Sequence, residues 1–149
     1  MAEYENANIE TIARGVLLRA GRLLVCMPAK GGRCYLPGGH VEFGETARQA
    51  LVREIAEEMG REAAAGEFLA VSENAFTQNG CPHCEINLIF RLDIPGLDPD
   101  SDPAAAEDWI RFRWVPLNGL AEANLLPAHL IADLPRWLAA PGAHAEDHP

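Results

Sequence analysis

The sequence predicts an α/β domain in which a mixed, partly antiparallel sheet is combined with two main helices. Short apolar segments alternate with turn signals along most of the chain, and two other segments have the periodicity of amphipathic helices. Most consecutive strands are separated by hairpin-length turns, which disfavours a doubly wound parallel sheet. The 149 residues, of which 48% are hydrophobic, can bury one core. We therefore expect one domain over residues 1–140.

Strands are expected where aliphatic and β-branched residues gather between turn signals. These segments are residues 9–18, 22–27, 34–36, 67–76, 85–94 and 111–115. Ala20-Gly21 and Asn79-Gly80 are turn signals, so the strands on either side of each should pair as hairpins. Pro37-Gly38-Gly39 is expected to end the third strand.

Two segments are expected to form helices. Residues 46–59 are rich in helix formers, Thr46 and Gln49 match a capping box, and Gly60 supplies a stop. Leu51, Ile55 and Met59 recur every four residues and should face the core. Residues 130–139 fit a closing amphipathic helix, and residues 141–149 are expected to be a frayed, disordered tail.

Charge and composition exclude several classes of protein. The net charge of −10 gives a surface that repels nucleic-acid backbones, so a DNA or RNA polymer is not an expected partner. No apolar run is long enough to span a membrane, and the polar, acidic segment Met1–Glu10 does not resemble a signal peptide. We expect a cytoplasmic protein with reduced cysteines, since Cys81-Pro82-His83-Cys84 has no second pair with which to form a zinc site.

The first expected helix carries a face of carboxylates. Glu54, Glu57 and Glu58 stand at positions i, i+3 and i+4, which places them on one side of a helix. Like charges at this spacing repel, so a helix selected only for stability would have lysine among them. Oxygen donors on a rigid scaffold suit Mg²⁺ or Mn²⁺. Taken alone, however, the pattern is also typical of a solvated acidic helix.

The residues before this helix favour a binding site. The glycines of Leu36-Pro37-Gly38-Gly39 allow the backbone to approach a ligand closely. Glu45 precedes the helix, and Arg53 stands where it could pair with Glu45 and connect the loop to the helix. A loop, an ion pair and a carboxylate face together predict a site.

These residues also follow a known spacing, so the chain resembles the Nudix hydrolase family. The Nudix box reads Gly-x5-Glu-x7-Arg-Glu-apolar-x-Glu-Glu-x-Gly-apolar. The matching positions are Gly39, Glu45, Arg53, Glu54, Ile55, Glu57, Glu58 and Gly60. Arg61 departs from the pattern, since an aliphatic residue usually stands there. The order of the surrounding strands and the segment Trp114–Leu117 extend the resemblance over nearly the whole chain.

The resemblance implies an α/β/α sandwich that hydrolyses a nucleoside diphosphate linked to another moiety, as in nucleotide sugars, ADP-ribose or nucleoside triphosphates. It implies Mg²⁺ (or Mn²⁺) as the cofactor and a homodimer as a possible assembly. Arg53 with Glu45 would orient the carboxylates, and Glu54 would be either a further ligand or the base that activates water. The implied metal ligands are the Gly38 carbonyl, Glu54, Glu57 and Glu58.

Residues outside the box are candidates for the remaining roles. Many members of the family add a carboxylate from a later loop, for which Glu107 is the first candidate and Asp108 and Glu85 are alternatives. His40, next to Gly39, could reach a phosphate. Four aromatic residues could stack on a nucleobase. They are Tyr35, Phe43, Phe76 and Trp109.

Two functions of different classes remain open. The first is a metal-dependent pyrophosphohydrolase, and the second is a nucleotide-binding sensor that has the fold without the catalysis. Sensors of this kind usually lose glutamates of the box, whereas Glu45, Glu54, Glu57 and Glu58 are all present. The sequence therefore favours the enzyme, while it does not specify which nucleotide is cleaved.

Overall fold

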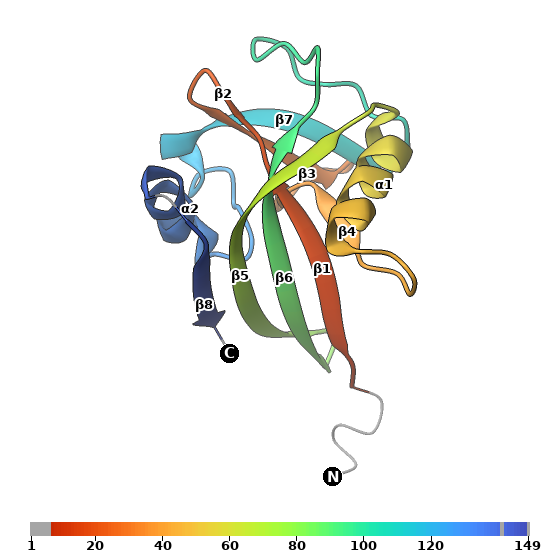
Figure 1. The fold of residues 1–149 in the computed structure, drawn as a ribbon, viewed down its shortest axis with the longest axis vertical. Coiled ribbons are helices and arrows are strands. Elements are labelled where there is room, and N and C mark those ends of the chain that lie inside the picture. The colour runs from red at the N-terminus through yellow and green to blue at the C-terminus, as the bar shows by residue number, and fades with distance from the viewer. Residues whose placement is uncertain (1–6, 141, 149) are drawn as a thin grey trace.

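The computed structural model describes residues 7–140 and 142–148. Within these residues the chain forms two α-helices, eight strands and one 3-10 turn (Figure 1). None of the helices in this part of the chain is long and apolar enough to cross a membrane. In order, the elements are β1 (Ile9–Val16), β2 (Leu18–Arg19), β3 (Arg22–Pro28), β4 (Gly38–His40), α1 (Ala47–Met59), β5 (Ala64–Gln78), β6 (Cys81–Asp93), β7 (Ile110–Pro116), η2 (Leu117–Gly119), α2 (Leu130–Ala139) and β8 (His144–His148).

The strands form two sheets that lie between the two helices. The larger sheet has the order β4-β1-β6-β5-β8, with parallel β1–β6 and β5–β8 pairs and antiparallel neighbours elsewhere. The smaller sheet, β2-β3-β7, is antiparallel. Figure 1 shows α1 and α2 on opposite sides of the strands. This arrangement confirms the predicted α/β sandwich with a mixed sheet.

Strand β3 contributes to a hydrophobic core on each of its faces. Leu24 and Cys26 pack in the core beneath α1, whereas Leu23 and Val25 pack in the core beneath α2. Successive side chains of a strand point to opposite faces, so burial on both faces explains its nearly continuous run of apolar residues. The helices therefore rest on a shared, closely packed layer of strands.

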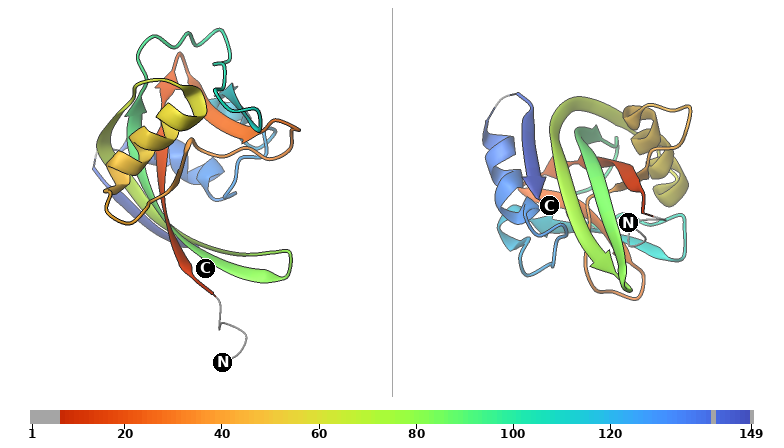
Figure 2. Two further views of the ribbon diagram at one scale, coloured as in Figure 1. Left: turned by 90° about the vertical axis from the view of Figure 1, so that its right-hand side faces the viewer. Right: turned by 90° about the horizontal axis from the view of Figure 1, so that it is seen from below.

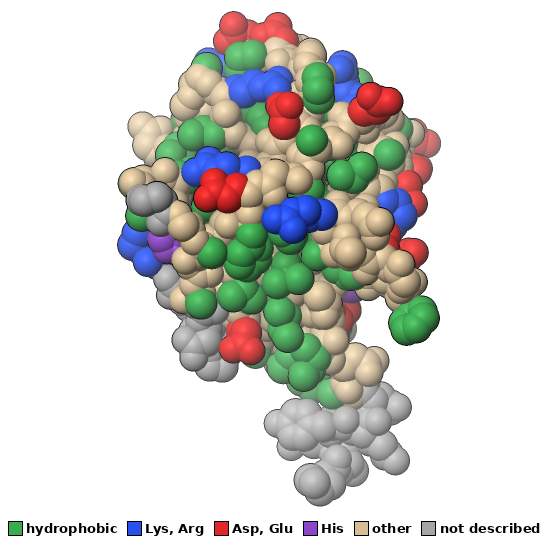
Figure 3. All heavy atoms as spheres, viewed as in Figure 1, with side chains coloured by type: hydrophobic (Ala, Val, Ile, Leu, Met, Phe, Trp, Pro, Cys, Tyr) green, Lys and Arg blue, Asp and Glu red, His purple; other side chains and the backbone are tan. Residues whose placement is uncertain are grey.

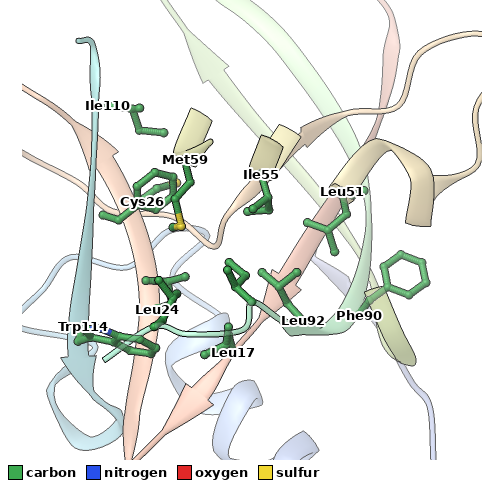
Figure 4. Packing of buried hydrophobic residues seen from close by; sticks show 14 of the residues in the cluster. Leu17, Leu24, Cys26, Leu51, Ile55, Met59, Phe90, Leu92, Ile110 and Trp114 are labelled. Carbon is green, nitrogen blue, oxygen red and sulfur yellow. The ribbon is translucent and has the colours of Figure 1, made fainter. Parts of the chain in front are cut away.

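Helix α1 begins and ends where the sequence predicts. The Thr46 hydroxyl accepts a hydrogen bond from the Gln49 amide at 3.2 Å, and the Gln49 side chain accepts one from the Thr46 amide at 2.8 Å. Gly60 closes the helix in the left-handed conformation, with a φ of 70°. The expected stripe of Leu51, Ile55 and Met59 is buried (Figure 4). The capped and packed helix is a rigid support for its outer face.

Replacing Thr46 by alanine is expected to lower the free energy of unfolding by about 1 kcal/mol, because it leaves the Gln49 amide without its capping acceptor. Urea denaturation of the purified protein measures the change. Thr46→Ser, which keeps the hydroxyl, is the matched control and should lose only a small part of this stability. An equal loss in both variants would contradict the assigned cap.

Three segments differ from the sequence-based expectation. The strand expected over residues 9–18 is divided, because the chain leaves the larger sheet after Val16 and enters the smaller one at Leu18. Residues 34–36 make only isolated bridges, whereas the regular strand is β4, which was expected to be a strand-ending turn. Residues 144–148 lie in the expected frayed tail but form β8, parallel to β5. In each case the strand with which a segment pairs determined its secondary structure, and β4 and β8 pair with strands that are distant in the sequence.

The hairpin of β5 and β6 is longer than the sequence indicates. Asn79 and Gly80 form its turn with φ values of 52° and 76°, as the Asn-Gly signal predicts. Pairing runs from Ala64 with Asp93 to Gln78 with Cys81, interrupted by register shifts between Ala65 and Ala70. Figure 2 shows that the distal end of this hairpin projects beyond the rest of the molecule.

Candidate active site

Arg53 connects the loop before α1, the helix itself and strand β4. Its guanidinium donates to both carboxylate oxygens of Glu45, at 3.0 and 2.7 Å, and to the backbone carbonyl of His40 at 3.1 Å. The same group contacts Glu54 at 3.1 Å and Glu57 at 3.3 Å. The hydrogen bonds from Arg53 hold the pKa of Glu45 below its usual value. The predicted ion pair of Glu45 and Arg53 is therefore present, and it is bidentate.

Glu58 is a buried carboxylate whose negative charge is poorly compensated. Its residue is 6% exposed, and its Oε2 has no hydrogen-bond partner among the described residues. Burial, together with hydrogen bonding to Glu54 and the charge of Glu54, raises the pKa of Glu58 to about 8, although the positive charge of Arg14 opposes the change. An uncompensated buried carboxylate is costly, and a cation is the partner that would relieve that cost.

Gly38 and Gly39 bring the backbone of β4 close to this pair of carboxylates. A Cβ atom on Gly39 would lie 2.6 Å from the carboxyl carbon of Glu54. Gly38 has a φ of +139°, and a Cβ atom there would overlap the carbonyl oxygen of Ala13 on β1. Only glycine fits at either position without displacement of a neighbour.

The carboxylates open into a cavity of about 410 Å³, hereafter the acidic cavity. Two carboxylates, the two glycines of β4, an arginine, a tyrosine and the candidate histidine contribute polar groups to its wall. These residues are Arg14, Tyr35, Gly38, Gly39, His40, Glu54 and Glu58. The side of the molecule on which α1 lies carries acidic side chains at its surface (Figure 3). A concave site that combines carboxylates with an arginine suits an anion that binds together with cations.

The residues of the box meet around this cavity, but not all of them line it. Gly38, Glu54 and Glu58 line the wall, whereas Glu57 is exposed and turned toward Arg53. Accordingly, within residues 7–140 and 142–148 no three His, Cys, Asp or Glu side chains are already arranged as the ligands of one metal ion. The donor set itself fits a hard divalent cation, because it offers carboxylate oxygens, one of them buried and without a hydrogen-bond partner in the described part of the chain.

The later acidic candidates lie apart from the acidic cavity. Glu107 and Asp108 are exposed and do not line it, although the neighbouring Ala106 donates a backbone hydrogen bond of 2.8 Å to the carbonyl of Glu58. The loop that carries Glu107 is thus anchored to the end of α1. Glu85, the other alternative, lines a second cavity on the far side of Arg14.

This second cavity, hereafter the strand cavity, has a volume of about 440 Å³. Arg14 and Tyr35 line both cavities, so the two are adjacent. Arg14 was not among the predicted site residues. A charged residue within the apolar run Ile12-Ala13-Arg14-Gly15-Val16 is nevertheless a pattern that indicates a functional side chain. Three other polar residues that line the strand cavity were also not predicted, namely Ser72, Asn74 and Asn87. Of the aromatic candidates, Tyr35 and Phe76 line the strand cavity, and Trp109 lines the acidic cavity.

A fold with two helices around mixed strands, and the glycines of β4 beside a helix that bears the box carboxylates, defines a hydrolase of the Nudix class. The family model for the NUDIX domain matches residues 10–134, so the chain belongs to the Nudix family. It is therefore related to enzymes that hydrolyse phosphoric anhydride bonds of nucleotides, and such hydrolases generally use divalent metals.

Similar proteins cover most of the chain. A Mycobacterium tuberculosis protein named "Putative 8-oxo-dGTP diphosphatase 2" is 33% identical over 145 residues, which is 93% of this chain and 96% of that protein. The ADP-ribose pyrophosphatase of Methanocaldococcus jannaschii is 34% identical over 111 residues, covering 74% and 61% of the two chains. The solution structure of the Escherichia coli ORF135 protein has a TM-score of 0.63 at 27% identity, covering 89% and 91%.

Proposed function

We propose that this protein is a metal-dependent pyrophosphohydrolase that cleaves the diphosphate of a nucleoside diphosphate linked to another moiety. The observation that carries the proposal is Glu58, which is buried beside Glu54 with one oxygen lacking a hydrogen-bond partner among the described residues. A helix that served only as support would place an apolar residue there, since burying a carboxylate opposes folding.

Each box residue has a distinct role in this proposal. Glu57 and Glu58, with the Gly38 carbonyl, would hold Mg²⁺ or Mn²⁺, and Glu54 would be either a further ligand or the base. The metal when bound supplies charge neutralisation of the diphosphate and activation of water. Arg53 and Glu45 orient the carboxylates, because one guanidinium contacts Glu45, Glu54 and Glu57. Arg14 faces the acidic cavity as a cation for the phosphate oxygens.

The base that takes the proton from water is proposed to be Glu54. It lines the acidic cavity, and it lies between Arg53 and the buried Glu58. Glu107 remains the alternative, since its loop is hydrogen-bonded to the end of α1 through Ala106. The exposed position of Glu107 outside the cavity favours Glu54 in the geometry at hand.

The reaction and its dependence on metal are tested with a panel of nucleotides. Nucleotide sugars, ADP-ribose and nucleoside triphosphates are incubated with the protein in Mg²⁺, in Mn²⁺ and in EDTA, in water enriched in ¹⁸O, and the product masses are recorded. We expect cleavage within the diphosphate, one ¹⁸O atom in a phosphate product, and loss of activity in EDTA that is reversed by added metal. Tight nucleotide binding without any product in either metal would instead identify a binding module.

A cytoplasmic location and a homodimer remain predictions. The four cysteines are free thiols, as expected in a reducing compartment. Burial raises the pKa of Cys26 to about 12, so that thiol is inert at neutral pH. Sedimentation equilibrium of the purified protein would establish its oligomeric state.

A further inference from the structure

Four polar side chains form a compact group on one face of the β5–β6 hairpin. Ser72 pairs with Asn87 across the two strands, and Asn74 pairs with Glu85 in the next position of the same face. All four line the strand cavity. Glu73, which lies between Ser72 and Asn74, is exposed and does not line it, as the alternation of side chains along a strand requires.

Two of these side chains are buried and two are half-buried, and the described residues satisfy them incompletely. Ser72 is 1% exposed and Asn87 is 4% exposed. Within the described part of the chain, the Ser72 hydroxyl has no hydrogen-bond partner. Asn87 donates to Glu85 over 3.4 Å, which is long for a hydrogen bond. Buried polar groups are normally hydrogen-bonded to protein, water or ligand, so an incompletely satisfied group at a cavity wall is positioned to bind a ligand that enters the cavity.

The strand cavity is placed to receive whatever is attached to the diphosphate. Arg14 lines both cavities, and its guanidinium is held by a hydrogen bond of 3.0 Å to the carbonyl of Leu36. A phosphate chain at Arg14 therefore has the box carboxylates on one side and the polar group of β5 and β6 on the other. Tyr35, which also borders both cavities, offers an aromatic ring beside the same path.

The part of the wall formed by Glu85 and Asn87 favours a hydrogen-bond donor on the ligand, whereas Arg14 and Arg33 elsewhere in the cavity are donors for anionic groups. An ionised carboxylate only accepts hydrogen bonds, and when Asn87 donates to Glu85 the oxygen of the Asn87 amide is left as a further acceptor. Among the nucleobases, exocyclic amino groups are the donors that match such acceptors, as in the pairing of glutamate with the amino group of cytosine. We propose that Glu85, supported by Asn87, selects nucleotides whose base carries an exocyclic amino group.

This inference rests on the proposed function, since it assigns the group recognised beside the same diphosphate site. It predicts discrimination between bases that differ in an amino group. GTP and ITP differ by the 2-amino group, ATP and ITP by the group at position 6, and CTP and UTP by the group at position 4. A site that hydrogen-bonds a substrate donor rejects the analogue without it, because its own buried acceptors are then unpaired.

The experiment compares these pairs in the wild-type protein and in Glu85→Gln. In the wild type, we expect kcat/KM to favour the amino-bearing member of at least one pair by tenfold or more. In Glu85→Gln, which is isosteric, that preference should fall below about threefold, because an amide presents one acceptor and a competing donor. Glu73→Gln is the matched control, since it makes the same change on the opposite face of the hairpin, and it should retain the preference.

Two further measurements distinguish a failure of the inference from a failure of the proposed function. The same nucleotides are titrated by calorimetry, and Glu85→Asp, which keeps the charge, should retain part of the preference. Hydrolysis without a preference within any pair, or a preference that Glu85→Gln leaves unchanged, overturns the inference while the proposed function stands. If no nucleotide is hydrolysed, the proposed function fails. The dissociation constants from calorimetry then test the inference, because a preference for the amino-bearing nucleotide that Glu85→Gln removes supports it, and equal affinities within every pair overturn it.

Discussion

Glu58→Gln is expected to lower kcat by at least about a hundredfold while leaving the protein as stable as the wild type or more stable. The wild-type carboxyl group is buried, its Oε2 lacks a hydrogen-bond partner among the described residues, and its pKa is raised to about 8, so a neutral amide of the same shape avoids the cost of ionising a buried group. Loss of activity with unchanged or higher stability is the signature of a residue kept for function. Steady-state kinetics and thermal unfolding in EDTA measure the two effects.

Glu57→Gln provides the complementary case on the same helix. Glu57 is exposed and contacts Arg53 at 3.3 Å, so its replacement should change the free energy of unfolding by less than about 1 kcal/mol. Its kcat should nevertheless fall by orders of magnitude if it holds metal. Glu62→Gln, at an exposed position after the helix, is the control and should leave kcat and stability unchanged. Near-normal turnover in both Glu57→Gln and Glu58→Gln would contradict the proposed mechanism.

Gly38→Ala is expected to lower the free energy of unfolding by about 3 kcal/mol or more and to reduce activity with it. The added Cβ would overlap the carbonyl oxygen of Ala13 and lie 3.0 Å from its carbonyl carbon. Both atoms belong to the backbone of the paired strand β1, so neither can rotate away from the added methyl group as a flexible side chain could. The cost therefore combines a φ of +139°, which L side chains rarely adopt, with overpacking against a sheet.

Gly32→Ala separates these two contributions. Gly32 has a φ of +112°, but nothing lies within 4 Å of the position that its Cβ would occupy. It should therefore lose only the conformational part, about 1 kcal/mol. Guanidinium denaturation of both variants gives the difference. Equal losses would mean that β4 moves to accommodate the methyl group and that the close approach of β4 to β1 is not essential.

Local signals in the sequence were sufficient to predict α1 and the carboxylate face that it carries. The cap at Thr46, the stop at Gly60 and the carboxylate spacing each depend on residues within one or two turns of the helix, so they are readable without knowledge of the fold. The ion pair of Glu45 and Arg53 was predicted from residues that are close in the sequence, with Glu45 just before the helix and Arg53 in its second turn.

Features that depend on distant pairing were not readable. Strand β4 consists of Gly38, Gly39 and His40, a composition typical of a turn, and it becomes a strand because β1 offers it an edge. The buried polar group of the strand cavity was likewise hidden, because Ser72 and Asn87 meet only through the register of β5 with β6. Glu85 was considered as a catalytic acid, whereas the structure places it at the strand cavity rather than at the box.

Strand β1 lies between β4 and β6, and both are hydrogen-bonded to it in a defined register. Gly38 pairs with Arg14, and Arg14 pairs with Ile89, which is four residues from Glu85 along β6. The backbone at Gly38 and the backbone at Glu85 are therefore separated by about 10 Å across the sheet and about 13 Å along it. Since this separation belongs to the backbone, side-chain motion cannot change it. If the proposed function holds, the sheet therefore fixes the spacing between the diphosphate site and the polar group of the strand cavity, and substrates that span this spacing should bind more tightly than shorter ones.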